Sequence, residues 1–116
     1  MLVVGAGPAG AAAAITLAKA GSDVLVVDKA TFPRDKCCGD GLTTGALRRL
    51  EALGLDPDDV PSWRWVDDVL VGGPNGHEVR YPLPRDGHFA AVASRLDLDA
   101  ALVARARTVG DRKSVV

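Results

Sequence analysis

The chain has 116 residues, and its 14 basic and 15 acidic side chains give a formal net charge of −1. This length suffices for one domain with a buried core, but it is short for an enzyme that binds a dinucleotide. The balanced charge, without a basic stripe, argues against nucleic acid as a partner. No apolar run is long enough to cross a bilayer and no basic leader precedes the first predicted strand, so we expect a cytoplasmic protein.

A glycine-rich motif directly follows the first predicted strand, which occupies residues 1–4. Residues 5–10 read Gly-Ala-Gly-Pro-Ala-Gly and open an alanine-rich helix that we expect to end before Gly21. This strand-to-helix context is the one that the dinucleotide-binding fingerprint requires. Such a loop turns tightly, lets a pyrophosphate approach the backbone, and presents unpaired N–H groups of the first helical turn. The motif therefore predicts cofactor contacts from Gly5, Gly7, Pro8, Ala9 and Gly10.

A second predicted strand, over residues 24–27, is apolar throughout, as a buried parallel strand should be. It ends at Asp28, eighteen residues after Gly10, which is close to the usual spacing of the carboxylate that binds ribose hydroxyls. An acid at this position favours free ribose hydroxyls over a 2′-phosphate. The alternative is an ordinary βαβ unit with a surface acid after its second strand.

The rest of the chain mixes helical and antiparallel patterns. We expect a loop over residues 29–41, a helix from Leu42 to Leu53 and a strand running from the tryptophans to Val71. A turn at residues 73–76 and a returning strand at 79–81 predict a hairpin. A strand over 89–93 and a helix from Ser94 to about Arg107 follow. The fold class is therefore α/β, a partial Rossmann-like FAD/NAD(P)-binding fold with an inserted antiparallel hairpin.

One loop resembles the geranylgeranyl reductase family of FAD-dependent oxidoreductases, part of a wider group of aromatic-ring hydroxylase-like flavoproteins. The matching pieces are the Phe-Pro-Arg segment at 32–34, Lys36, the Cys38-Gly39 pair and Gly41, together with a later Ser94-Arg95 helix start. Cys37 departs from the pattern, where proline or another residue is expected. The resemblance covers most of residues 1–110.

This resemblance implies bound FAD, with NAD(P)H as the electron donor and an isoprenoid or other lipid as a possible substrate. The implied cofactor contacts are Lys29, Arg34, Cys38, Gly39, Gly41 and Arg95, in addition to the glycine motif and Asp28. The alternatives are that the two arginines are solvated or pair with Asp35 or Asp97, and that Cys38 is only a small apolar side chain. The sequence identifies no catalytic residue beyond Cys38, which the resemblance places near the flavin.

The remaining aromatic, histidine and cysteine residues point to structure more than to chemistry. Trp63 and Trp65 share a strand face and are expected to pack in the sheet, with a wall for a lipophilic substrate as the alternative. The two histidines lack partners at ligand spacing, so we expect no metal. The only cysteines are adjacent, which favours a reducing compartment.

The sequence predicts that residues 1–110 are the truncated N-terminal part of an FAD-binding domain and that residues 111–116 are a non-native tail. The parent enzyme is expected to reduce isoprenoid double bonds, with a flavin monooxygenase acting on an aromatic or polyketide substrate as the alternative. A third hypothesis is a non-catalytic nucleotide-binding fragment. We expect the fragment alone to be inactive, and the parent could contact a membrane peripherally.

Overall fold

The computed structural model describes residues 1–110, so the tail predicted at 111–116 lies outside the described residues. The chain begins with a βαβ unit, in which strand β1 (Leu2–Val4), helix α1 (Pro8–Lys19) and strand β2 (Leu25–Val27) follow one another. The two strands pair in parallel, with Val3 opposite Val26. The predicted fold class is confirmed, since antiparallel sheets follow this parallel start.

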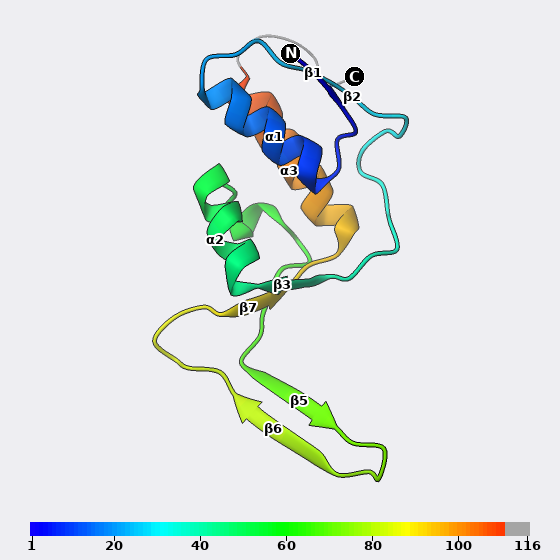
Figure 1. The fold of residues 1–116 in the computed structure, drawn as a ribbon, viewed down its shortest axis with the longest axis vertical. Helices are drawn as coiled ribbons and strands as arrows, with labels where there is room; N and C mark the ends of the chain where they lie inside the picture. The colour runs from blue at the N-terminus through cyan, green and yellow to red at the C-terminus, as the bar shows by residue number, and fades with distance from the viewer. Residues whose placement is uncertain (111–116) are drawn as a thin grey trace.

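Two helices form the centre of the molecule. Helix α3 (Arg95–Val109) lies beside α1, as Figure 1 shows, and the most deeply buried apolar side chains come from their contact. Ile15 of α1 and Leu102 of α3 are almost completely buried. Ser94 caps α3, as predicted, because its hydroxyl accepts the backbone N–H of Asp97 at 3.3 Å. The packing of α1 against α3 therefore sets the position of the first turn of each helix relative to the other.

A three-stranded antiparallel sheet lies next to α2 (Thr44–Leu53), with the strand order β3-β7-β4. The strands are β3 (Gly41–Thr43), β7 (Ala90–Val92) and β4 (Arg64–Trp65). The predicted helix start at Leu42 is wrong, because Leu42 pairs with Ala91 in this sheet. Thr43 caps the helix instead, accepting the N–H of Ala46 at 3.4 Å. Pairing with a distant strand outweighs the local helical pattern of residues 42–53.

The predicted strand through the tryptophans and Val71 is two strands. Trp65 ends β4, which pairs with β7, whereas β5 (Asp68–Gly72) pairs with β6 (Glu78–Pro82). The predicted hairpin turn is confirmed, because Gly73 donates to the carbonyl of His77 at 2.8 Å. The two strands belong to different sheets because their partners lie in different parts of the chain.

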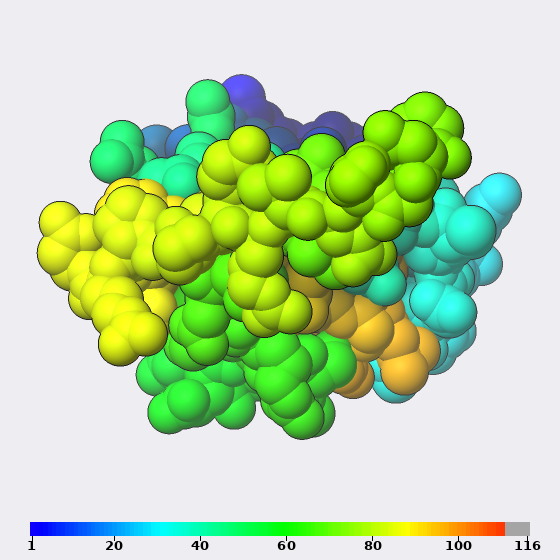
Figure 2. All heavy atoms as spheres, turned by 90° about the horizontal axis from the view of Figure 1, so that it is seen from below, coloured from blue at the N-terminus to red at the C-terminus, as the bar shows by residue number. Residues whose placement is uncertain are grey.

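The hairpin β5–β6 projects away from the helices (Figure 1), and Figure 2 views the molecule from the end at which it projects. Val69 faces Tyr81 and Val71 faces Val79 across the pair, so these four side chains share one face. All four are exposed, at 44% to 57%. The hairpin therefore presents an uncovered apolar face within the described structure.

None of the helices within residues 1–110 has the length and apolar character needed to span a bilayer. Across the same residues, no group of His, Cys, Asp and Glu side chains is arranged to hold a metal ion. Cys37 and Cys38 are both free and exposed.

Candidate functional site

The glycine motif forms the tight turn between β1 and α1. Gly5 has φ +98° and donates its N–H to the carbonyl of Val27 at 2.7 Å, which ties the turn to the end of β2. A Cβ on Gly10 would lie 2.9 Å from the carbonyl carbon of Gly5 and would overlap the attached oxygen. Close packing of α1 on this turn thus requires glycine at position 10, as the fingerprint predicts.

The first turn of α1 is open to a ligand. Gly7 is its N-cap residue and makes no side-chain capping bond, and Pro8 occupies the first turn. The half-exposed loop therefore presents backbone N–H groups at the positive end of the helix dipole. This arrangement suits phosphate oxygens.

Two guanidinium groups lie against the same loop. A Cβ on Gly7 would lie 3.4 Å from Nη2 of Arg34 and 4.0 Å from Nη2 of Arg95. The structure thus brings together three predicted site residues that are far apart in the sequence. Cations and backbone donors converge on one side of the loop, which is the donor set that a pyrophosphate requires.

Asp28 holds the glycine motif in place through hydrogen bonds to the backbone. Its Oδ2 accepts the backbone N–H of Ala6 at 2.6 Å and its Oδ1 accepts that of Ala30 at 2.8 Å. These two bonds, to Ala6 first, lower the pKa of the Asp28 carboxyl, and the nearby Arg34 and Lys29 lower it further. Each carboxylate oxygen keeps a further acceptor site, so Asp28 has the capacity to accept the predicted bond from a ribose hydroxyl as well.

The lowered pKa of Asp28 makes stability depend on pH. Because the folded-state pKa lies below the unfolded one, the stabilisation is present above about pH 4 and is lost as the pH falls through the folded-state value. We expect Asp28→Asn to lower the free energy of unfolding by about 1 kcal/mol at pH 7, and we expect this difference to shrink towards pH 3. Denaturant unfolding of the full-length wild type and of Asp28→Asn, between about pH 7 and pH 3, measures this difference in free energy. A difference that stays constant with pH would show that the charge of Asp28 does not stabilise the fold.

Asp99 is a site residue that the sequence analysis missed. Its side chain is completely buried, and it forms a two-bond pair with Arg95, Nε to Oδ1 at 2.8 Å and Nη2 to Oδ2 at 2.8 Å. Nη1 of Arg34 lies 3.0 Å from the same Oδ2. The arginines therefore share Asp99, and neither of the predicted alternative partners, Asp35 and Asp97, pairs with them. The spacing of Arg95 and Asp99, four residues apart in a predicted helix, is the signal for half of this cluster.

The shared carboxylate stabilises the charged form of Arg95. Hydrogen bonding to Asp99 raises the pKa of Arg95, and a smaller contribution comes from the Cys38 side chain, which also contacts Arg95. Arg34 also stacks over the ring of Phe32, with 4.9 Å between the guanidinium carbon and the ring centroid. The cluster remains cationic because two guanidinium groups face one carboxylate.

The other predicted contacts lie on the exposed loop that follows β2, except Gly41, which is the first residue of β3. Lys29 is exposed, and so are Cys38, Gly39 and Gly41. A Cβ on Gly39 or Gly41 would meet no other atom within 4 Å, so the described structure leaves space beside both. Cys38 is joined to the cluster through Arg95. Lys29 lies near Asp28 and Cys38 near Arg95, and the contacts of all four residues to a flavin stay a prediction.

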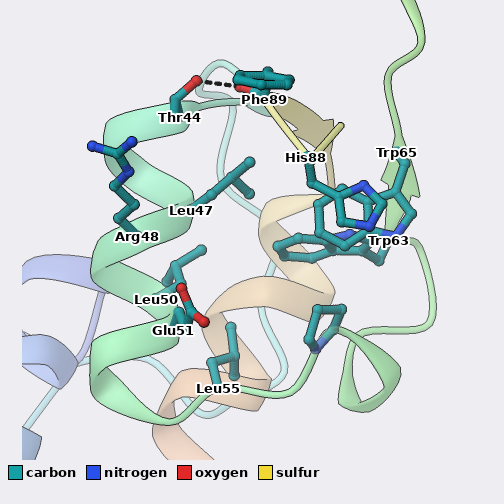
Figure 3. A pocket seen from close by; sticks show the side chains of 12 residues that line it. Thr44, Leu47, Arg48, Leu50, Glu51, Leu55, Trp63, Trp65, His88 and Phe89 are labelled. Atoms are coloured by element: carbon teal, nitrogen blue, oxygen red, sulfur yellow. Dashed lines mark hydrogen bonds between the residues drawn. The ribbon is translucent and has the colours of Figure 1, made fainter. Parts of the chain in front are cut away.

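The tryptophans line a separate cavity of about 470 Å³. The rings of Trp63 and Trp65 meet edge to face, with centroids 5.2 Å apart, and Trp65 stacks on His88 at 3.8 Å. Figure 3 shows these rings on the side of the cavity opposite α2, with the Thr44 hydroxyl donating to the carbonyl of Phe89 at 2.6 Å. Trp63 also packs against the main apolar core, which agrees with the predicted packing role. The predicted shared strand face is wrong, because β4 begins after Trp63, and Trp65 is 39% exposed. None of the cavity's lining residues belongs to the glycine and arginine cluster.

Comparison with known proteins points to the same part of the chain. A family model described as "FAD binding domain" matches residues 1–61. The chain is 44% identical to menaquinone reductase of Mycobacterium tuberculosis over 119 residues, covering 97% of this chain and 28% of that protein. It is 38% identical to digeranylgeranylglycerophospholipid reductase 2 of Methanopyrus kandleri, covering 95% of this chain and 26% of the relative.

Among solved structures, the chain is similar to the tetrameric form of 2-methyl-3-hydroxypyridine-5-carboxylic acid oxygenase. The TM-score is 0.76 at 32% identity, over 94% of this chain and 29% of the other. The chain thus spans less than a third of the length of the proteins it matches. The resemblance to the geranylgeranyl reductase family is confirmed by these relatives.

Proposed function

Because the chain belongs to the FAD binding domain family, we propose that it forms the part of an FAD-dependent oxidoreductase that holds the ADP half of the cofactor. One observation carries this proposal. The uncapped first turn of α1 and the guanidinium groups of Arg34 and Arg95 meet at Gly7, in a turn that Gly10 packs closely against through Gly5. Such a concentration of hydrogen-bond donors and positive charge favours a pyrophosphate over a neutral ligand.

Each side chain has a separate task in this proposal. The backbone N–H groups at the start of α1 and the two arginines bind the phosphates, while Asp28 holds the loop in shape and accepts a bond from the adenosine ribose. The exposed residues 38–41, at the end of the loop and the start of β3, would contact the flavin ring in this proposal. When bound, FAD supplies hydride transfer between a nicotinamide and a substrate. The residues described here orient the cofactor for that chemistry.

For the whole protein we propose reduction of an isoprenoid double bond, with NAD(P)H as the donor. The support is the similarity to reductases whose names specify menaquinone and digeranylgeranylglycerophospholipid. The second candidate is a monooxygenase, and the similarity to a pyridine-carboxylic acid oxygenase at 32% identity favours it. The two differ in whether reduced flavin passes its electrons to a carbon–carbon double bond or to oxygen.

The full-length protein tests the two reactions directly. We expect it to saturate one double bond of a prenylated substrate when supplied with reduced nicotinamide under anaerobic conditions, as detected by a mass increase of two hydrogens. Substrate-stimulated oxygen consumption with incorporation of one oxygen atom would instead establish the monooxygenase. A protein that retains no flavin and performs neither reaction would leave only the non-catalytic hypothesis.

Replacement of Asp28 tests the proposed FAD site. We expect Asp28→Ala in the full-length protein to weaken FAD binding by roughly 1.5–3 kcal/mol, the scale of hydrogen bonds to a charged group. Fluorescence titration of the apoprotein with FAD measures the change. Asp35→Ala is the matched control, because Asp35 is an exposed acid on the following loop that contacts neither the glycine motif nor the arginines. Unchanged FAD affinity in Asp28→Ala would remove Asp28 from the site.

A further inference from the structure

Asp99 is the one charged side chain that is completely buried within residues 1–110. Burying a carboxylate is costly unless it is paired and hydrogen-bonded, and Asp99 meets this condition only through Arg34 and Arg95. Its position places a negative charge directly behind the proposed phosphate site. A negative charge behind a phosphate site repels phosphates, so Asp99 should weaken binding unless it has a second, opposing effect.

The two arginines are held in different ways. Arg95 donates from Nε and Nη2 to the two carboxylate oxygens of Asp99, so these two nitrogens are occupied by the pair. Nη1 of Arg34 lies 3.0 Å from Oδ2 but makes no hydrogen bond of good geometry, and its Nη2 is the closest side-chain atom to the space over Gly7. Arg95 and Asp99 thus form a fixed base, against which Arg34 is held by charge and by the ring of Phe32.

We propose that Asp99 is a positioning residue that holds the guanidinium of Arg34 over Gly7, within reach of the diphosphate of an adenine nucleotide. This inference rests on the proposed function. Without the carboxylate, Arg34 and Arg95 repel each other, and only the ring of Phe32 remains to keep the long side chain of Arg34 beside the loop. Asp99 therefore strengthens the binding of an anion even though it is itself an anion.

This role and simple electrostatics predict opposite results for Asp99→Asn, which keeps the size of the side chain and removes the charge. If Asp99 only adds negative potential, the variant binds ADP more tightly than the wild type. If Asp99 positions Arg34, the variant binds ADP roughly tenfold more weakly or worse, which is the loss of a charge-assisted contact. The sign of the change decides between the two.

The experiment is calorimetric titration of the full-length apoprotein with ADP and, separately, with adenosine. We expect Asp99→Asn to lose affinity for ADP while its affinity for adenosine stays within about twofold of the wild type, because adenosine carries no phosphate for Arg34 to bind. A merely structural defect would weaken both ligands together.

Arg34→Met provides a second test that does not depend on the folding of Asp99→Asn alone. The double variant Arg34→Met/Asp99→Asn has one unpaired guanidinium where Asp99→Asn has two, so it should melt at a higher temperature than Asp99→Asn, but its ADP affinity should be as low as that of Arg34→Met. ADP binding by Asp99→Asn as tight as the wild type, or tighter binding by the double variant than by Arg34→Met, would overturn the inference. If the wild type binds neither ADP nor FAD, the proposed function fails instead.

Discussion

Gly10→Ala is expected to remove FAD from the full-length protein. The added methyl group would overlap the carbonyl oxygen of Gly5 and lie 2.9 Å from its carbonyl carbon, while Cγ1 of Val3, at 3.5 Å, closes the remaining space. Because these neighbours are mostly backbone, they cannot rotate away, and α1 must shift from β1. Overpacking of this kind costs typically about 1–3 kcal/mol, and the same shift moves the phosphate-binding N–H groups. Flavin content after purification and the melting temperature measure the two effects.

Gly45→Ala is the matched control for this substitution. Gly45 lies in the first turn of α2, and a Cβ there would meet only the hydroxyl of Thr43, at 3.9 Å. Alanine in a helix is favoured over glycine by roughly 0.5–1 kcal/mol, so this variant should be as stable as the wild type or more stable, with full flavin content. A Gly10→Ala protein that binds FAD with wild-type affinity would show that the close approach at Gly5 is not needed for the cofactor.

The second large effect is expected for the 116-residue chain expressed alone. Val69, Val71, Val79 and Tyr81 form an exposed apolar hairpin face, and β1 and β2 form a sheet of only two strands. Uncovered apolar faces and unpaired strand edges promote association between molecules. We therefore expect the chain alone to be poorly soluble or loosely folded, to carry far less than one flavin per chain, and to show no turnover with reduced nicotinamide.

Size-exclusion chromatography, visible absorption and thermal unfolding of this chain, each compared with the full-length protein, measure these properties. A monodisperse yellow protein that melts cooperatively would contradict the expectation. In that case residues 1–110 would be a self-sufficient cofactor-binding unit, and the exposed hairpin face would need no cover.

The parts of the fold that the sequence predicts well are those with strong local signals. The glycine motif, the alanine-rich helix and the apolar strand before Asp28 identify the βαβ unit without any tertiary information. The hairpin turn at 73–76 and the serine cap of α3 are equally local. Strands β3 and β4 were missed or merged because each is only two or three residues long, and only pairing with β7 makes them strands.

The residues of the candidate site also fall into those predicted by local sequence signals and those set by tertiary packing. Spacing alone places Asp28 after the second strand, where the structure has it contacting the glycine motif. The sharing of Asp99 by Arg34 and Arg95 could not be predicted, because it depends on how α3 packs beside α1 and on the path of a long loop. Only the spacing of Arg95 and Asp99 within one helix gave a usable hint. Pairing with a distant buried acid is a tertiary property that no local pattern encodes.

The cofactor content of the purified full-length protein shows whether it is a flavoprotein. Denaturation releases a non-covalent flavin, and chromatography of the released material identifies it and gives its ratio to protein. We predict close to one FAD per chain, and a marked loss of FAD in Asp28→Ala but not in Asp35→Ala. A folded full-length protein that is colourless and takes up no FAD on titration would contradict the account.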